Sequence, residues 1–258
     1  MSGQISRPVD LRVFGLGGLP EVQPGADLPA LIGDSIAASG LGIQPGDVIV
    51  VTHKVVSKAE GRLVDLTGVE PSPRAREFAE TWGKDARQVE VVLQEARRIS
   101  RMERGIIIAE TAHGFVCANA GVDASNVAAE TVCLLPKDPD HSATEIRAAL
   151  EERFGIAPGV IVSDSFGRPW RNGIVNVAIG VAGLAPLADY RGQHDAVGYE
   201  LRASIIAIAD ELAGTAELVM HKLDARPVAL IRGYVPPTGT PHGTGKDLVM
   251  GPERNLYR

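Results

Sequence analysis

Short segments rich in valine and isoleucine follow one another in close pairs along this chain, and this order limits the folds open to it. Gly105–Ala109 with Phe115–Ala118 is one such pair, and Gly159–Val162 with Ile174–Ile179 is another. Strands joined by a short connection pair antiparallel, whereas parallel neighbours need a crossover of a dozen or more residues. The pattern therefore disfavours a regular doubly wound sheet. It predicts an α+β (mixed α/β) fold with antiparallel-rich sheets and packed helices.

The remaining elements follow from the spacing of apolar residues and from cap residues. Further strands are expected at Leu11–Phe14, Asp47–Thr52, Thr131–Leu135 and Val228–Arg232. Helices are expected at Asp27–Ala38, Pro73–Trp82, Ala86–Ser100, Ser142–Phe154 and Gly198–His221. Ser72 before Pro73 is predicted to be an N-cap, and Ser142 with Glu145 is predicted to form a capping box.

The composition is that of a globular protein with no affinity for nucleic acid or membranes. The 258 residues carry a formal net charge of −6, and only 4% of them are aromatic. The chain therefore has neither the basic field nor the stacking platforms of nucleic-acid-binding proteins. It also has no hydrophobic signal core at its N-terminus and no run of about 18 apolar residues. We expect a cytoplasmic protein that forms a single unit over residues 1–258, with a polar C-terminal tail at 236–258.

The segment from Val162 to Gly173 places four polar or charged groups after a strand that is predicted to be buried. Asp164 and Ser165 offer hard oxygen ligands to a divalent cation, and Arg168 and Arg171 can each form two hydrogen bonds with a phosphate or carboxylate. The alternative is a strand end whose aspartate caps a turn and whose arginines are solvated. Because four such groups fall within one turn, we favour a site for a cation and its phosphates.

A second candidate carboxylate, Asp123, lies among small residues in the segment Asn119–Asn126. Small side chains let a ligand approach the backbone, and an aspartate there can bind a hard cation. The alternative is a turn stabilised by aspartate and asparagine side chains. If the fold brings Asp123 and Asp164 together, they can share one or two Mg²⁺ or Mn²⁺ ions that bridge phosphates.

Three further segments are candidates for nucleotide contacts. His53–Arg62 follows a very apolar strand, and its lysines suit triphosphate oxygens, although a solvated hairpin is the alternative. Gly15–Pro20 has a proline where a dinucleotide fingerprint needs its last glycine, so it is either a backbone contact or a turn. Gly239–Asp247 is one residue too long for a P-loop and lacks its Ser/Thr. The two cysteines, Cys117 and Cys133, are expected to be buried thiols.

Four of these segments occur in the order and approximate spacing seen in the coenzyme F420 gamma-glutamyl ligases. They are Gly18–Pro20, Val56–Arg62, Asn119–Asn126 and Ser163–Arg171. The similarity runs from Leu11 to about Arg258 and includes Ile231–Gly233. Some bacterial relatives carry a second, flavin-reductase-like domain, whereas this chain resembles the stand-alone ligase.

The resemblance implies a GTP-dependent ligase that adds L-glutamate, through gamma-linked amide bonds, to the precursor of the deazaflavin coenzyme F420. It implies an acyl-phosphate intermediate, Mg²⁺ or Mn²⁺ with two ions expected, and K⁺. The family fold is mixed α/β and assembles as an intertwined homodimer, built either as a single unit or as two intertwined subdomains.

The resemblance also implies a role for individual residues. Asp123 and Asp164 match metal-binding aspartates, and Ser165 matches a hydroxyl that also contacts metal. The matches to nucleotide contacts are Gly17, Gly18, Leu19, Pro20, His53, Lys54, Lys58, Asn126, Met220, His221 and Lys222. The expected catalytic residues are Asp164, which acts through the metal ion, and Lys58, Arg168 and Arg171, which would stabilise developing negative charge or orient the anionic acceptor. Met220–Asp224 departs from the glycine- and acid-rich loop of archaeal relatives, which leaves the last metal ligand and the base contacts open.

Two other functions remain open for the same residues. The first is a metal-dependent phosphohydrolase that releases phosphate to water. The second is a non-catalytic homodimer that binds a nucleotide without an acceptor.

Overall fold

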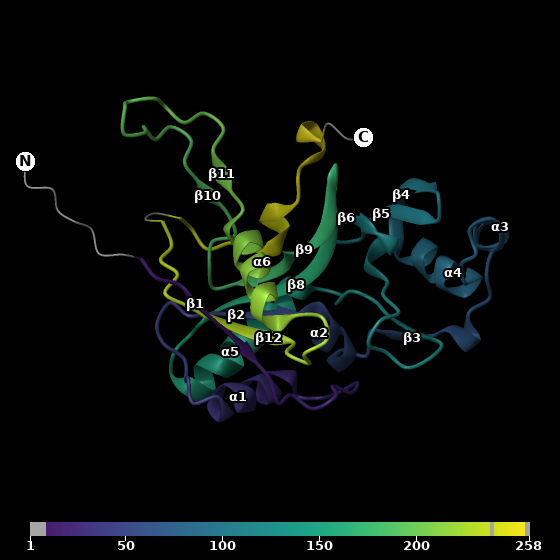
Figure 1. Cartoon of the computed structure of the whole chain (residues 1–258), viewed down its shortest axis with the longest axis horizontal. Coiled ribbons are helices and arrows are strands. Elements are labelled where there is room, and N and C mark those ends of the chain that lie inside the picture. Colours follow the sequence, from purple (N-terminus) through teal and green to yellow (C-terminus); the bar gives the residue numbers. More distant parts are fainter. Residues whose placement is uncertain (1–8, 238–239, 256–258) are drawn as a thin grey trace, which may run out of the picture.

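The computed structural model describes residues 9–237 and 240–255, and its larger part is built around one five-stranded sheet (Figure 1). The strands, in spatial order, are β1 (Arg12–Leu16), β12 (Val228–Arg232), β2 (Val48–Thr52), β8 (Gly159–Arg168) and β9 (Arg171–Ala182). Neighbours pair antiparallel except β2 and β8, which are parallel. The predicted α+β class with mostly antiparallel pairing is confirmed.

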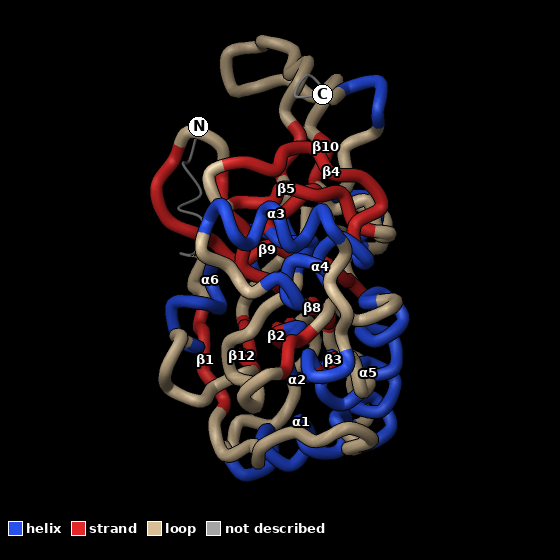
Figure 2. Tube along the Cα trace, turned by 90° about the vertical axis from the view of Figure 1, so that its right-hand side faces the viewer, coloured by secondary structure: helices blue, strands red, loops and turns tan. Residues whose placement is uncertain are grey.

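Helices cover both faces of this sheet. α1 (Leu28–Ala38), α2 (His53–Ala59) and α5 (Pro139–Phe154) pack on one face, and α6 (Ile208–Met220) packs on the other. Figure 2 shows α5 and α6 on opposite sides of the strands. Within β2, Ile49 and Val51 join the first core and Val48 and Val50 join the second. Burial on both faces explains why β2 reads as a continuous apolar run.

A smaller lobe lies between α2 and α5 in the sequence and at the right of Figure 1. Its strands are β3 (Leu63–Asp65), β4 (Ala96–Glu103), β5 (Ile106–Thr111), β6 (Val116–Ala118) and β7 (Thr131–Cys133). β4, β5 and β6 form one antiparallel sheet, and β3 pairs with β7. α3 (Pro73–Trp82) and α4 (Ala86–Glu95) pack on the first of these sheets through Phe78 and Val92. The 3-10 helices are Leu66–Gly68, Asn119–Gly121, Gly245–Leu248 and Pro252–Arg254.

The eight predicted strands all exist, and the predicted helix Pro73–Trp82 is confirmed with Ser72 as its N-cap. The prediction of one helix over Ala86–Ser100 is wrong, because the helix ends at Glu95 and the chain continues as β4. Pairing of β4 with β5 outweighs the helical pattern, and Ile99 and Met102 pack into the lobe's core. Tertiary pairing of this kind routinely overrides local propensity.

The prediction of a helix over Gly198–His221 is wrong in its first half. The chain between β10 (Ala188–Asp189) and β11 (Ile205–Ile206) projects from the body (Figure 1). Asp195 Oδ1 accepts hydrogen bonds from the backbone N–H groups of Val197 and Tyr199, both at 2.9 Å. This Asx turn, with a positive φ at Gly198, is incompatible with a helix. Only Ile208–Met220 is helical.

The predicted capping box of Ser142 is wrong as well. The helix begins at Pro139, and Asp138 is its N-cap, accepting a hydrogen bond from the His141 N–H. Proline at the first helical position needs no N–H donor, so the Asp-Pro pair sets the start of the helix. The Ser142 hydroxyl instead donates to Glu60 Oε1 at 2.5 Å.

β8 is longer than predicted, and this changes the placement of the candidate carboxylate. Asp164 and Ser165 lie within the strand, opposite Val177 and Asn176 of β9, and not in a turn after it. The turn itself falls at Pro169 and Trp170, between the paired residues Arg168 and Arg171. Asp164 is therefore held by sheet hydrogen bonds, which fix its position better than a loop would.

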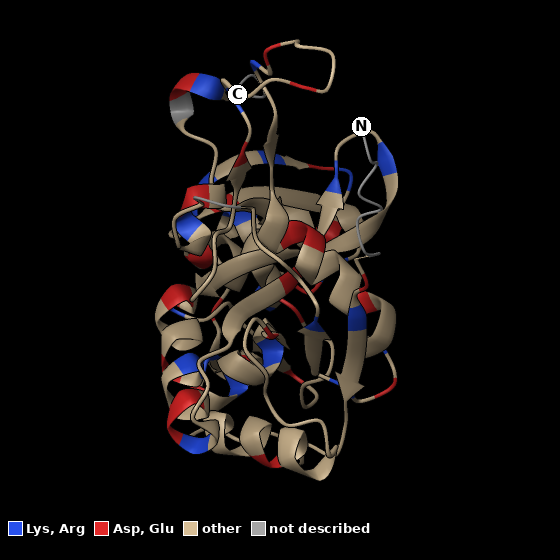
Figure 3. Ribbon diagram, turned by 90° about the vertical axis from the view of Figure 1, so that its left-hand side faces the viewer, with Lys and Arg blue, Asp and Glu red and all other residues tan. Residues whose placement is uncertain are grey.

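Charged residues of both signs are interspersed over the side of the molecule drawn in Figure 3. Among the described residues, no helix is long and apolar enough to span a membrane. Part of the predicted polar tail packs on the body, since the Gly245 N–H donates to buried Asp140 at 2.6 Å. Residues 238–239 and 256–258 of that tail lie outside the described residues.

Replacing Arg232 with methionine is expected to lower the free energy of unfolding by about 3–5 kcal/mol. Arg232 donates to both carboxylate oxygens of Asp47, at 2.9 and 2.7 Å, and the Asp47 side chain is only 1% exposed. The substitution leaves a buried charge without its partner. Urea denaturation measures the change, with Arg74→Met, at an exposed position, as the control. A loss below about 1 kcal/mol would show that the pair carries little stability.

Candidate active site

Helix α2 begins where β2 ends and binds both candidate carboxylates. Because β2 and β8 are parallel and Thr52 lies opposite Ser163, α2 and Asp164 lie at the same end of these two strands. His53 Nε2 lies 3.2 Å from Asp164 Oδ1, with the two side chains 3% and 15% exposed. Lys54 Nζ lies 2.8 Å from Asp123 Oδ2. Because His53 and Lys54 are consecutive, two carboxylates distant in sequence each contact the start of one helix.

The same helix binds the segments that carry the other predicted nucleotide contacts. The Lys58 ammonium, 7% exposed as a residue, is paired with Glu21, which directly follows the loop Gly17–Pro20. Lys54 also donates to the hydroxyl of Ser125, next to Asn126. The alternative of a solvated hairpin at His53–Arg62 is therefore wrong. Most of that segment forms a short helix, and residues in or next to three other predicted motifs contact this helix.

The Asp123 carboxyl is an ionised group in a partly buried place. Burial raises its pKa, but the hydrogen bond from Lys54 and the Ser125 backbone N–H, at 2.6 Å, together lower it more. The net pKa lies below the ordinary value, so the carboxylate is charged at neutral pH. A charged oxygen donor suits a hard divalent cation.

Ser165 points away from Asp164, because successive side chains of a strand face opposite sides of the sheet. Its hydroxyl donates to Asn176 Oδ1 at 2.8 Å and accepts from Lys222 Nζ at 2.6 Å. The Asn176 amide donates to Glu217 Oε2 at 2.9 Å, and Glu217 Oε1 lies 3.7 Å from Lys222 Nζ. These four residues form a closed ring on the α6 side of the sheet.

Other predicted site residues are not joined to the carboxylates by these contacts. Arg168 donates to the Asn172 carbonyl at 3.1 Å within its own hairpin, and Arg171 is exposed at the hairpin tip. Met220, the last residue of α6, is 1% exposed and packs in the core between α6 and the sheet. The His221 ring contacts Asp224 Oδ2 at 3.0 Å.

Sequence reasoning missed three polar partners in this region. Glu21 binds Lys58, and Asn176 and Glu217 complete the ring around Ser165. Asn176 did carry a signal, as it is the one polar residue inside the apolar strand Ile174–Ile179 and is only 4% exposed. Glu217 looked like an ordinary solvated residue of a helix.

The candidate ligands fit a divalent cation whose remaining coordination positions are filled by a substrate. Among the described residues, no group of three or more His, Cys, Asp or Glu side chains is arranged to hold a metal ion. Mg²⁺, however, is commonly bound by one or two carboxylates together with substrate phosphates and water. Asp123 and Asp164 match that pattern. Lys54 supplies positive charge beside Asp123, and the His53 ring contacts Asp164.

The two cysteines flank this region as buried, unreactive thiols. Burial raises the pKa of Cys117 to about 12, and the nearby Asp164 charge adds to the effect. Burial also raises the pKa of Cys133. Both are free, which confirms the prediction of buried thiols.

A raised pKa keeps a thiol protonated, and the thiolate is the reactive form. We therefore expect neither cysteine to react with iodoacetamide at pH 8 in the folded protein, and both to react in urea. Peptide mass spectrometry of the alkylated protein measures this. Rapid native labelling of Cys117 would contradict the burial described here.

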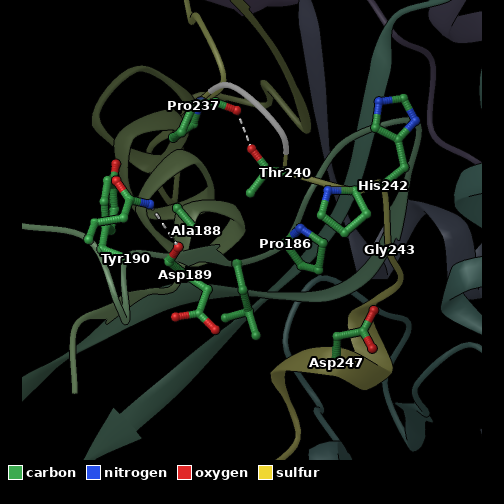
Figure 4. A pocket seen from close by; sticks show the side chains of 12 residues that line it. Pro186, Ala188, Asp189, Tyr190, Pro237, Thr240, His242, Gly243 and Asp247 are labelled. Atoms are coloured by element: carbon green, nitrogen blue, oxygen red, sulfur yellow. Dashed lines mark hydrogen bonds between the residues drawn. The ribbon is translucent and has the colours of Figure 1, made fainter. Parts of the chain in front are cut away.

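A cavity of about 480 Å³ lies apart from these residues, between Pro186–Gln193 and the C-terminal segment (Figure 4). Among the described residues that line it, none is lysine or arginine, and Asp189 and Asp247 add negative charge. The described lining therefore offers a polyphosphate no ammonium or guanidinium partner. The lysines and carboxylates around α2 are the better candidate for an active site.

Comparison with known proteins gives extensive similarity. A family model described as F420-0:gamma-glutamyl ligase matches residues 18–233. The coenzyme F420:L-glutamate ligase of Methanopyrus kandleri is 45% identical, covering 94% of this chain and 100% of that protein. Proteins of the same name from Methanothermobacter thermautotrophicus and Methanocaldococcus jannaschii are 43% and 46% identical. They cover 96% and 84% of this chain, and 99% and 86% of their own lengths.

Proposed function

Because the chain belongs to the F420-0:gamma-glutamyl ligase family, and is therefore a ligase that adds L-glutamate to the coenzyme F420 precursor, we propose that it does so with GTP at the site around α2. One observation carries this proposal. Asp164, Asp123 and Glu21 each contact a residue of the same short helix, and the residues that contact the two aspartates are consecutive. That arrangement offers carboxylates for a cation and ammonium groups for phosphates.

The reaction follows from the chemistry of the acceptor. A carboxylate is a poor electrophile, so an oxygen of the acceptor's carboxylate first attacks the γ-phosphorus of GTP, and GDP leaves. The glutamate amine then attacks the carbonyl carbon of this acyl phosphate. Inorganic phosphate leaves and the amine loses a proton, which gives the amide; the linkage is gamma when the activated carboxylate is the γ-carboxylate of a glutamate already attached.

We assign roles to the residues as follows. Asp123 and Asp164 would hold Mg²⁺ or Mn²⁺, which supplies charge neutralisation to the phosphates when bound. Lys58, buried beside the Gly17–Pro20 loop, stabilises negative charge that develops on the transferred phosphoryl group. With a cation on Asp123, Lys54 would be free to contact phosphate oxygens.

The remaining parts of the proposal rest on the family alone. The backbone of Gly17–Pro20 and the side chain of Asn126 contact the nucleotide, and Arg168 and Arg171 orient the anionic acceptor. Met220 takes part through its backbone, since its side chain is buried in the core. The protein works as a homodimer and uses K⁺ in addition to the divalent ion.

Mass spectrometry of the deazaflavin product tests this function. Incubation with GTP, Mn²⁺ and L-glutamate is expected to add glutamate residues to the precursor, with less product when ATP replaces GTP. Release of phosphate from GTP without glutamate or acceptor would favour a phosphohydrolase. Binding of GTP with neither product nor phosphate would favour a non-catalytic nucleotide-binding protein.

A further inference from the structure

The His53 ring is buried at the start of α2, with one nitrogen toward Asp164 and the other toward Ser57. Nε2 lies 3.2 Å from Asp164 Oδ1, and the His53 side chain is only 3% exposed. Nδ1 lies 3.5 Å from the hydroxyl of Ser57, a residue that is 0% exposed. A ring so deeply buried presents almost no surface to a nucleotide, so any nucleotide contact of His53 is made by its backbone. The ring is left to act on its neighbours.

The two neighbours of the ring favour one tautomer. A hydroxyl can donate a weak hydrogen bond to Nδ1 of a neutral imidazole, and the ring proton is then on Nε2. Nε2 faces a carboxylate oxygen, which can only accept when it is ionised. Ser57 and Asp164 therefore both favour the form of His53 in which the N–H group is on the side of Asp164.

The contacts of Asp164 leave one of its two oxygens open. Oδ1 faces His53 and also accepts a hydrogen bond from the Ser165 backbone N–H at 2.6 Å. Among the described residues, no hydrogen bond reaches Oδ2. The last torsion of an aspartate is soft, so the two oxygens of a free carboxylate readily exchange places. Two partners on Oδ1 oppose this exchange and keep Oδ2 available to a ligand.

We propose that His53 is a positioning residue for the divalent ion: its ring holds Asp164 Oδ1, so that Oδ2 is the oxygen that binds the ion. The proposal rests on the ligase function given above and adds one residue to the site. Carboxylates that bind metal ions are themselves hydrogen-bonded by a second group, and loss of that group typically costs about 10- to 100-fold in metal affinity. His53 acts through Asp164 and is not itself a ligand.

The two contacts of the ring can be removed separately. An asparagine side chain ends near the position of Nδ1 and keeps a polar group beside Ser57, whereas a glutamine side chain reaches the position of Nε2 beside Asp164. If His53 acts through Asp164, His53→Gln retains this role and His53→Asn loses it. If the ring only fills space or only contacts Ser57, the longer amide has no such advantage.

Mn²⁺ affinity, measured by EPR with saturating GDP, tests the proposal on the wild type and on both variants. Thermal unfolding checks that each protein is folded. We expect Mn²⁺ to bind about 10- to 100-fold more weakly to His53→Asn, and to bind His53→Gln within about threefold of the wild type. His141→Asn, at a histidine whose side chain is 67% exposed, is the control and is expected to bind Mn²⁺ as the wild type does.

A double-mutant cycle with Asp164→Ala gives a second measurement. Without the carboxylate there is nothing for His53 to hold, so His53→Asn in that background is expected to change Mn²⁺ affinity by less than about twofold. Wild-type affinity in His53→Asn, equal affinities of the two His53 variants, or additive effects in the cycle would overturn the proposal. A wild type that bound Mn²⁺ and ligated glutamate would leave the proposed function intact in those cases. If the wild type bound no Mn²⁺ with GDP, both proposals would fail, so the two failures are distinguishable.

Discussion

Replacement of Asp164 with alanine is expected to lower the rate of ligation by at least about 1,000-fold. This carboxylate would hold the cation that neutralises charge on the transferring phosphoryl group, and such neutralisation is worth several kcal/mol. The side chain lies in β8 and faces His53, where it is 15% exposed. Its removal takes away a ligand and leaves the sheet hydrogen bonds of the strand unchanged. Product formation is followed by mass spectrometry, and folding by circular dichroism and thermal unfolding.

Asp164→Asn is the sharper variant, because the amide keeps an oxygen that can accept a hydrogen bond from His53. We expect the same loss of turnover with a thermal midpoint close to that of the wild type. Asp10→Asn, at an exposed aspartate, is the control and is expected to ligate normally. Near-normal ligation by a well-folded Asp164→Asn protein would refute the assignment of this carboxylate.

Replacement of Lys58 with methionine is expected to lower kcat by about 100- to 1,000-fold while leaving the protein as stable as before or more stable. Lys58 is 7% exposed, so methionine fills a buried space and removes a charge that is costly to bury. Its partner Glu21 has a side chain that is 71% exposed, and it remains solvated after the change. A structural role for Lys58 would give the opposite result, with lost stability.

Steady-state kinetics with varied GTP and urea denaturation on the same preparation separate the two outcomes. Lys84→Met, at an exposed lysine in the smaller lobe, is the matched control and is expected to change neither quantity. A stable Lys58→Met protein with unchanged kcat would remove Lys58 from the mechanism. Loss of at least about 2 kcal/mol of stability would assign it to the fold instead.

The strands were predictable from the sequence because their signal is local. β2 and the first half of β8 are rich in buried valine and isoleucine, and the close pairs of strands indicate antiparallel pairing. Errors arose where distant partners decide the structure. β4 is a strand because β5 lies beside it, and residues 198–207 are not helical because an Asx turn at Asp195 interrupts any helix. Neither partner is visible in the local pattern of apolar residues.

The candidate site divides in the same way. Asp123, Asp164 and the lysines could be singled out because charged groups next to buried strands are unusual. The helix that contacts them could not be predicted, because the sequence pattern at α2 indicates a strand exit or a hairpin. The parallel pairing of β2 with β8, which brings Asp164 to His53, joins residues more than a hundred positions apart. Asn176 and Glu217 acquire their role only when β9 and α6 are packed together.

The smaller lobe contributes one side of the site. Asp123 forms an isolated bridge with Cys133 of β7, and this fixes its carboxylate opposite Lys54. Val122, the neighbour of Asp123, packs on the lobe's core around Phe78 and Val92. Any movement between the lobe and the main sheet would therefore change the separation of Asp123 from Asp164.

Anomalous diffraction from crystals grown with Mn²⁺ and a non-hydrolysable GTP analogue tests the central claim most directly. We predict a manganese peak about 2.1 Å from carboxylate oxygens of both Asp123 and Asp164, with phosphate oxygens of the analogue completing its coordination. A peak elsewhere, or a bound nucleotide with Asp123 still held by Lys54 and Asp164 by His53, would contradict it.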